Sequence, residues 1–240
     1  MIFPTQKQLE LFKRTPGAIS VHEMVAIMNV VAQAPNGVFC EMGSHRGKSG
    51  TAAAFAMAMT HGFNLHMVDP LYDMTNLEAW SHACQGHPDN AWCGAKEEGF
   101  NESIVALIAE ASEGAVLAVL HGDFSTHAIP EIYNSEGQIA YCFLDSDQHQ
   151  YELVKEELGL LKDRMMIGGI IGFHDFQSQY LGVEQAYREA LEGDIFHEVS
   201  IDWEQIKGWV SGHGGEEGNE SWHHKGNPAP CFFGALRKNK

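Results

Sequence analysis

The sequence predicts an α/β domain built around a parallel β-sheet, and three observations lead to this fold class. Two short apolar runs, 38–40 and 64–68, flank an alanine-rich helical run over 51–59. Two apolar strands joined by one helix within about 30 residues form a βαβ unit, whose strands are parallel. Further apolar runs alternate with helical patterns along the chain. Counting from 38–40, each of the first five apolar runs ends at or just before an acidic residue.

Two helices are expected ahead of the first strand. Residues 5–14 carry mixed charge around apolar positions, and Pro16-Gly17 ends this short helix. Ser20 and Glu23 have the spacing of a capping box, in which each side chain accepts from the other residue's backbone N–H. Apolar residues follow at helical spacing, so we expect a second helix of about a dozen residues.

The rest of the chain alternates between the two element types. We expect helices over 103–111, 128–133, 151–161 and 183–191, and strands over 116–120, 139–144, 166–173, 195–201 and 231–236. Segments 71–100 and 203–229 contain many His and Trp residues without clear periodicity, so we expect excursions or lid loops there. The chain is therefore expected to be a single domain, 1–240, with an N-terminal helical segment over 1–36.

Composition and charge exclude several classes of protein. The net charge of −17 leaves few cations to neutralise phosphates, which argues against nucleic-acid and anionic-membrane partners. No apolar run approaches the roughly 18 residues of a membrane span, and the N-terminus lacks the apolar region of a signal peptide. The five cysteines are odd in number and scattered, which predicts reduced thiols and a cytoplasmic location.

The most informative stretch is the glycine-containing turn over 37–50. An apolar run ends in Glu41, and Gly43, Gly47 and Ser49 precede the alanine-rich helix. This order predicts a strand, a tight turn and a helix N-terminus, where free backbone N–H groups meet the positive end of the helix dipole. The stretch therefore predicts a ligand with hydroxyls or an anionic group.

Three ligands compete for this turn. A phosphate-binding P-loop needs one more residue between its glycines than Gly43 and Gly47 provide, and Glu41 would place a negative charge near the phosphates. A dinucleotide motif needs glycine where His45 stands. S-adenosylmethionine (SAM) has no phosphates and carries a cationic sulfonium, so it tolerates an acidic strand end, and Asp69 is placed to accept from its ribose hydroxyls.

The acidic residues at the strand ends predict where a site would form. They are Glu41, Asp69, Asp123, Asp145 and Asp175. The carboxyl ends of parallel strands lie along one edge of the sheet, and ligands bind there at the point where the strand order reverses. Five acids in such positions favour a binding site over a solvated rim.

Five motifs, taken in order, resemble class I SAM-dependent methyltransferases, and most closely their small-molecule and sugar O-methyltransferase-like branch. They are EMGSHRGKS at 41–49, VDP at 68–70, GDFS at 122–125, FLDSD at 143–147 with His149 and Tyr151, and GGIIGFHD at 168–175. The resemblance implies a Rossmann-like, seven-stranded, mostly parallel sheet of order 3-2-1-4-5-7-6. In that fold the last strand is antiparallel and helices cover both faces.

The resemblance also implies which residues bind the cofactor. Those that would line its methionine and ribose part are Glu41, Gly43, Ser44, Gly47 and Ser49. Asp69 would accept from the ribose hydroxyls, and Asp123 with Phe124 would contact the adenine. We therefore expect SAM as the cofactor.

Many relatives also bind a divalent cation, Mg²⁺ or another, at the ends of the fourth and fifth strands. Asp145, His174 and Asp175 match these positions, with His174 standing where an acid often stands. A metal there would lower the pKa of an acceptor hydroxyl, and Asp145 and His149 would act in catalysis, His149 as the base.

We expect methyl transfer to a hydroxyl of a small molecule, with sugars among the candidates. A homodimer is consistent with the resemblance. Two alternatives stay open, a non-catalytic SAM-binding module and a P-loop-type nucleotide-binding protein.

Overall fold

The computed structural model describes residues 1–17, 19–60, 64–73, 75, 99–146, 150–176, 180–213 and 233–240. Its strands are β1 (Val38–Met42), β2 (Asn64–Val68), β3 (Leu117–His121), β4 (Ile139–Leu144), β5 (Met165–Phe173), β6 (Phe196–Glu198) and β7 (Gly234–Lys238). They form one seven-stranded sheet of order β3-β2-β1-β4-β5-β7-β6. β7 runs antiparallel to β5 and β6, and the other neighbouring pairs are parallel. The predicted topology is confirmed.

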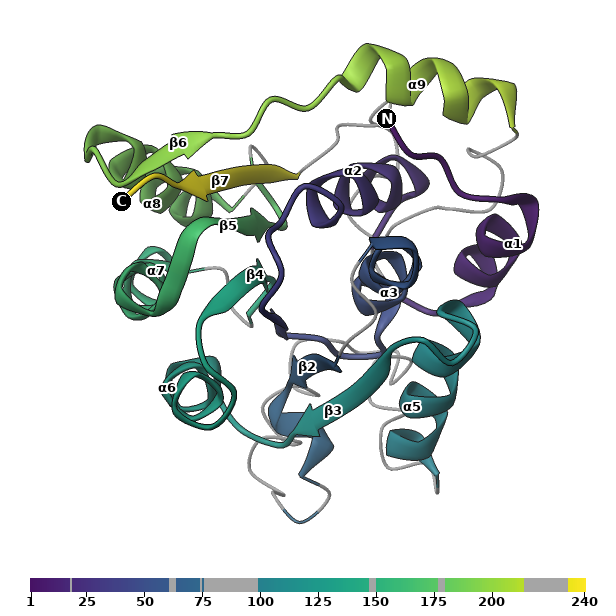
Figure 1. Cartoon of the computed structure of the whole chain (residues 1–240), viewed down its shortest axis with the longest axis horizontal. Coiled ribbons are helices and arrows are strands. Elements are labelled where there is room, and N and C mark those ends of the chain that lie inside the picture. The colour runs from purple at the N-terminus through teal and green to yellow at the C-terminus, as the bar shows by residue number, and fades with distance from the viewer. Residues whose placement is uncertain are drawn as a thin grey trace.

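Helices cover both faces of the sheet (Figure 1). They are α1 (Gln6–Arg14), α2 (Val21–Val31), α3 (Lys48–Thr60), the short 3-10 helix η1 (Pro70–Tyr72), α5 (Phe100–Ala111), α6 (Ser125–Glu136), α7 (Tyr151–Arg164), α8 (Leu181–Glu192) and α9 (Trp203–Gly212). Among the described residues, no helix has the length and apolar character needed to span a lipid bilayer.

A hydrophobic core lies on each face of the sheet. Successive residues of a strand point to opposite faces, so each strand contributes side chains to both cores. Phe39 and Tyr141 enter the core shared with α1, α2, α3, α5 and α9. Cys40 and Cys142 enter the other core, which α6, α7 and α8 cover. Almost all of α2 is buried, with Asn29 the only residue of the helix that is not. Tight packing on both faces holds the carboxyl ends of the strands in fixed positions.

The predicted loop at 203–229 is wrong in its first part, because residues 203–212 form α9. Asp202 caps this helix by accepting from the backbone N–H of Gln205 at 3.0 Å. Ile206 and Val210 are fully buried and face α2, and Trp209 stacks on Phe3 with ring centroids 5.3 Å apart. The segment is thus a packed helix in which only two residues are buried.

Other expected boundaries also shift. The predicted turn at 128–133 is part of the twelve-residue helix α6, which contains Pro130. The predicted strand 195–201 shortens to the three residues of β6, and β7 begins at Gly234 rather than at position 231. Most of the predicted excursion 71–100 and the rest of 203–229 lie outside the described residues.

Candidate active site

The turn between β1 and α3 brings three strand ends into contact. Gly43 has a φ of 81° and Gly47 a φ of 75°, in the left-handed region that favours glycine. A Cβ on Gly43 would lie 2.0 Å from the carbonyl oxygen of Asp145, so only glycine allows the turn to approach the residue after β4. The Gly43 N–H also donates to the Val68 carbonyl at 2.9 Å, at the end of β2.

Glu41 is buried beneath this turn, with 2% of its surface exposed. The Ser49 hydroxyl, at the start of α3, donates to Glu41 Oε1. Within the described part of the chain, Glu41 Oε2 has no hydrogen-bond partner. Burial, aided by the nearby carboxylates of Asp145 and Asp69 and opposed by the Ser49 hydrogen bond, raises the pKa of Glu41 to about 8.

The raised pKa predicts a pH dependence of stability. The folded protein keeps the Glu41 proton up to about pH 8, whereas the unfolded chain releases it near 4.5. The contribution of this group to stability is therefore fully present below pH 4.5 and is lost as the pH rises towards 8. Replacing Glu41 with Gln should leave stability similar at pH 4.5 and increase it relative to wild type at pH 8. Urea unfolding at several pH values measures this difference, and a difference independent of pH would contradict the assignment.

Asp69, at the end of the neighbouring strand β2, holds the turn by hydrogen bonds. Its Oδ2 accepts from the backbone N–H of His45 at 2.8 Å, and its Oδ1 accepts from that of Leu71 at 2.9 Å. The Tyr72 hydroxyl donates to the His45 carbonyl at 3.1 Å, and His45 itself has a φ of 42°. Each carboxylate oxygen can accept a second hydrogen bond, so Asp69 can fix the turn and still meet ribose hydroxyls.

The other predicted cofactor residues differ in exposure. Ser44 is buried, donating through its N–H to Val68 at 3.2 Å and through its hydroxyl to the Glu41 carbonyl at 3.3 Å. Asp123 accepts from the backbone N–H of Phe124 at 2.7 Å. The Phe124 side chain is 54% exposed, which offers a ring face at the sheet edge.

The predicted metal trio is brought together at the ends of β4 and β5. His174 Nδ1 lies 3.0 Å from Asp145 Oδ1 and 3.1 Å from Asp175 Oδ2. Asp175 adopts a φ of 56°, which few non-glycine residues do. Burial alone would lower the pKa of His174, but the Asp145 carboxylate, with Asp175 and Glu23, raises it well above its usual value.

This trio fits a divalent cation. Its three ligand atoms all lie within 4.8 Å of one another. The two distances from Nδ1 are those of a hydrogen bond and an ion pair, and they are also close to the roughly 3 Å that separates two ligands at right angles, each about 2.1 Å from an ion. Ion binding requires the ring proton to leave, since only a neutral imidazole can coordinate.

Residues 40–176, more than half of the chain, match a family model described as a methyltransferase domain. The chain belongs to this methyltransferase family. No curated protein matches it at a significant level.

Solved methyltransferase structures share the fold. An O-methyltransferase from Bacillus cereus in complex with SAH is 11% identical, with a TM-score of 0.58, and the match covers 100% of this chain and 93% of that one. TomG from Streptomyces achromogenes, in complex with SAM, is 12% identical with a TM-score of 0.61 and the same coverage. CalS11, a TDP-rhamnose 3'-O-methyltransferase, is 17% identical with a TM-score of 0.53, covering 98% and 96%. These likenesses show a class I methyltransferase fold.

Glu23 joins the site of this methyltransferase chain without having been predicted there, and Lys48 lies close enough to Glu23 to interact with it electrostatically. Glu23, on α2, places its Oε1 3.5 Å from His174 Nε2. Lys48, on α3, is buried, with its ammonium 4.8 Å from the Phe12 ring centroid and 3.4 Å from the Gly17 carbonyl. Burial lowers the pKa of Lys48 to about 8. The capping-box spacing predicts only a helix start for Glu23, because nothing local connects α2 with the end of β5.

One predicted catalytic residue lies outside the described residues. His149 falls in the range 147–149, so its role as the base stays a prediction.

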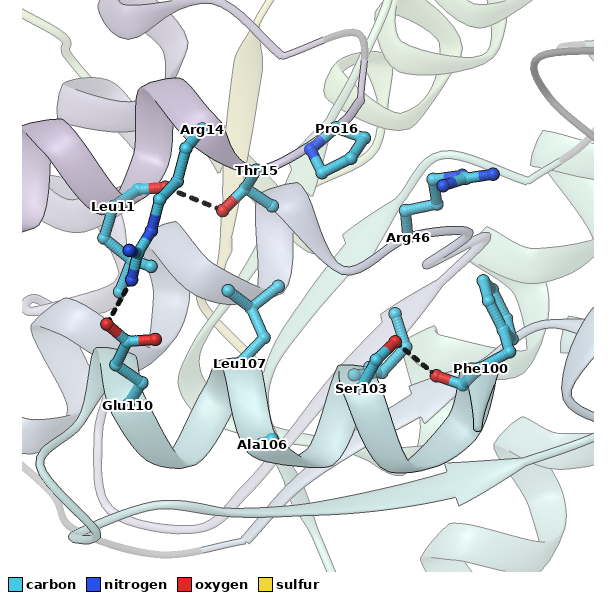
Figure 2. A pocket seen from close by; sticks show the side chains of 11 residues that line it. Leu11, Arg14, Thr15, Pro16, Arg46, Phe100, Ser103, Ala106, Leu107 and Glu110 are labelled. Carbon is cyan, nitrogen blue, oxygen red and sulfur yellow. Dashed lines mark hydrogen bonds and ion pairs between the residues drawn. The ribbon is translucent and has the colours of Figure 1, made fainter. Parts of the chain in front are cut away.

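A pocket of about 500 Å³ lies apart from the acidic trio, between α1 and α5 (Figure 2). Arg46 reaches it from the glycine turn, and Arg14 pairs with Glu110 across it. None of the predicted site residues lines it. This pocket therefore does not include the residues predicted at the carboxyl ends of the strands.

Proposed function

We propose that the protein is a SAM-dependent O-methyltransferase that acts on a small hydroxylated molecule with the help of a divalent cation. The observation that carries this proposal is the position of the trio Asp145, His174 and Asp175 beside the glycine turn, where Gly43 abuts Asp145. Cofactor turn and cation ligands are thus adjacent, as transfer from a bound cofactor to a bound hydroxyl requires.

The donor groups suit SAM better than a nucleotide. Glu41, Asp69 and Asp145 lie close enough to interact electrostatically. The carboxylates of Asp69 and Asp145 would favour a sulfonium and an ammonium group and would disfavour phosphates. Asp123 and the exposed ring of Phe124 would then contact the adenine, as the motifs predict.

The reaction is an in-line displacement. The acceptor oxygen attacks the methyl carbon, the carbon–sulfur bond breaks, and the sulfur keeps the electron pair, giving S-adenosylhomocysteine. Asp145, His174 and Asp175 would hold the cation, which would supply a lowered pKa of the acceptor hydroxyl. Asp145 and Asp175 would orient that hydroxyl beside the turn, and His149 is the proposed base that takes the proton.

The acceptor class rests on analogy with the similar structures. TomG is an O-methyltransferase of tomaymycin synthesis, and CalS11 is a TDP-rhamnose 3'-O-methyltransferase. We propose a sugar or another small hydroxylated compound, no nucleic-acid or membrane partner, a cytoplasmic location and a homodimer.

Calorimetry tests the cofactor assignment. SAM and S-adenosylhomocysteine should bind at one site per chain, and ATP with Mg²⁺ should give no heat beyond that of Mg²⁺ alone at the same concentrations. Tight ATP binding without SAM binding would refute the proposal in favour of a P-loop-type protein. SAM binding without S-adenosylhomocysteine formation across a panel of hydroxylated acceptors would instead point to a non-catalytic module.

A further inference from the structure

The geometry points to Glu23 as the positioning residue of His174, and we propose that this pair makes the cation site select first-row transition ions such as Co²⁺ and Mn²⁺ over Mg²⁺. The inference rests on the cation site of the proposed function, but not on turnover. Three steps support it.

The His174 ring lies between carboxylates on both sides. On one side Nδ1 faces Asp145 and Asp175 at 3.0 and 3.1 Å. On the other side Nε2 faces Glu23 Oε1 at 3.5 Å. A carboxylate behind a ligating histidine accepts the N–H of the far nitrogen, so the near nitrogen keeps its lone pair for the metal. Nδ1 is at hydrogen-bond distance from Asp145, so a cation would take the place of the proton on Nδ1, while the N–H of Nε2 stays directed at Glu23.

Hydrogen bonds at the start of α2 hold Glu23 in a fixed position. Its Oε2 accepts from the Ser20 N–H at 2.8 Å, and its own N–H donates to the Ser20 hydroxyl at 3.2 Å. The residue is 1% exposed, and within the described part of the chain its Oε1 has no hydrogen-bond partner closer than His174 Nε2, which it faces at 3.5 Å. A capping glutamate at a helix start usually faces solvent, whereas this one directs a buried oxygen at His174. The buried helix α2, which contacts both α3 and β5, fixes the position of the carboxylate.

The possible cation ligands of the trio include one nitrogen as well as carboxylate oxygens. One imidazole nitrogen and two carboxylates suit ions that accept nitrogen ligands, such as Mn²⁺, Co²⁺ and Zn²⁺. Mg²⁺ prefers oxygen ligands throughout and would meet a nitrogen at the His174 position. The histidine, held by Glu23, therefore changes which ion the site prefers, while the two acids keep it a cation site.

Metal binding to the metal-free protein, without SAM or acceptor, tests the proposal. Isothermal titration with Co²⁺ and Mg²⁺ should give at least 100-fold tighter binding of Co²⁺ to wild type. His174→Asp should shrink this ratio by at least tenfold. Glu23→Gln should weaken Co²⁺ binding 10- to 100-fold and change Mg²⁺ binding little. Pulsed EPR of bound Mn²⁺ should show coupling to an imidazole nitrogen in wild type and none in His174→Asp.

Ser20→Ala is the matched control for Glu23→Gln. It breaks half of the capping box, so it should lower the Tm, but it keeps the Glu23 carboxylate and should bind Co²⁺ within threefold of wild type. Equal affinity for Mg²⁺ and Co²⁺ in wild type, or a Glu23→Gln variant with unchanged Co²⁺ affinity, would overturn the inference. Predicted metal selection without any S-adenosylhomocysteine formation would refute the proposed function and leave this inference standing.

Discussion

Gly43→Ala is expected to destabilise the protein by at least about 3 kcal/mol and to weaken SAM binding at least tenfold. The left-handed φ of 81° costs a non-glycine residue about 1–2 kcal/mol. The new Cβ would in addition lie 2.0 Å from the Asp145 carbonyl oxygen, so the backbone after β4 must move. The glycine turn and the cation ligands would then separate. Urea unfolding and calorimetry with SAM measure the two effects.

Gly114→Ala is the matched control, because Gly114 has a φ of 84° and a Cβ there would meet nothing within 4 Å. It should cost only the backbone strain and leave SAM binding unchanged. If Gly43→Ala were no less stable than Gly114→Ala, the close approach of the turn to Asp145 would not contribute to the loss of stability.

Asp175→Asn is expected to lower kcat/KM for methyl transfer by about 10³-fold or more while leaving the SAM Kd within about threefold. Asn keeps the shape of the side chain and tolerates the left-handed backbone of this position, so the fold should persist. The lost negative charge removes one cation ligand from the trio. Steady-state kinetics and SAM calorimetry on the same preparation separate catalysis from cofactor binding.

Asp163→Asn serves as the control for this substitution, since Asp163 is an exposed residue of α7. It should match wild type in both measurements. Equal losses of turnover in Asp163→Asn and Asp175→Asn would show that net charge, and not ligation, explains the effect.

The elements on either side of the glycine turn could be predicted because their sequence patterns are local. The apolar run before Glu41, the two glycines and the alanine-rich helix lie within one continuous stretch, and β1 and α3 follow it. The acids at strand ends were also local observations, and the parallel topology brought Asp145 and Asp175 together as expected. The strand order came from the family resemblance, since no local pattern determines which strands pair.

The remaining features depend on contacts between distant parts of the chain. Glu23 faces His174 because α2 packs against the sheet, and its capping-box spacing predicts a helix start and nothing more. The helix α9 was missed because only Ile206 and Val210 mark its buried face, and Trp209 packs on Phe3 at the opposite end of the sequence. Such partners can be identified only after the fold is known.

The measurement that tests the central claim most directly is single-turnover transfer from methyl-labelled SAM to a hydroxylated acceptor, with wild type and Asp175→Asn both saturated with SAM. The account predicts that wild type forms labelled product and S-adenosylhomocysteine in equal amounts, that a chelator stops the reaction, and that added Co²⁺ or Mn²⁺ restores it. Asp175→Asn should hold SAM and transfer almost nothing. Transfer that proceeds unchanged in Asp175→Asn, or that is indifferent to the chelator, would contradict the role given to the trio at the ends of β4 and β5.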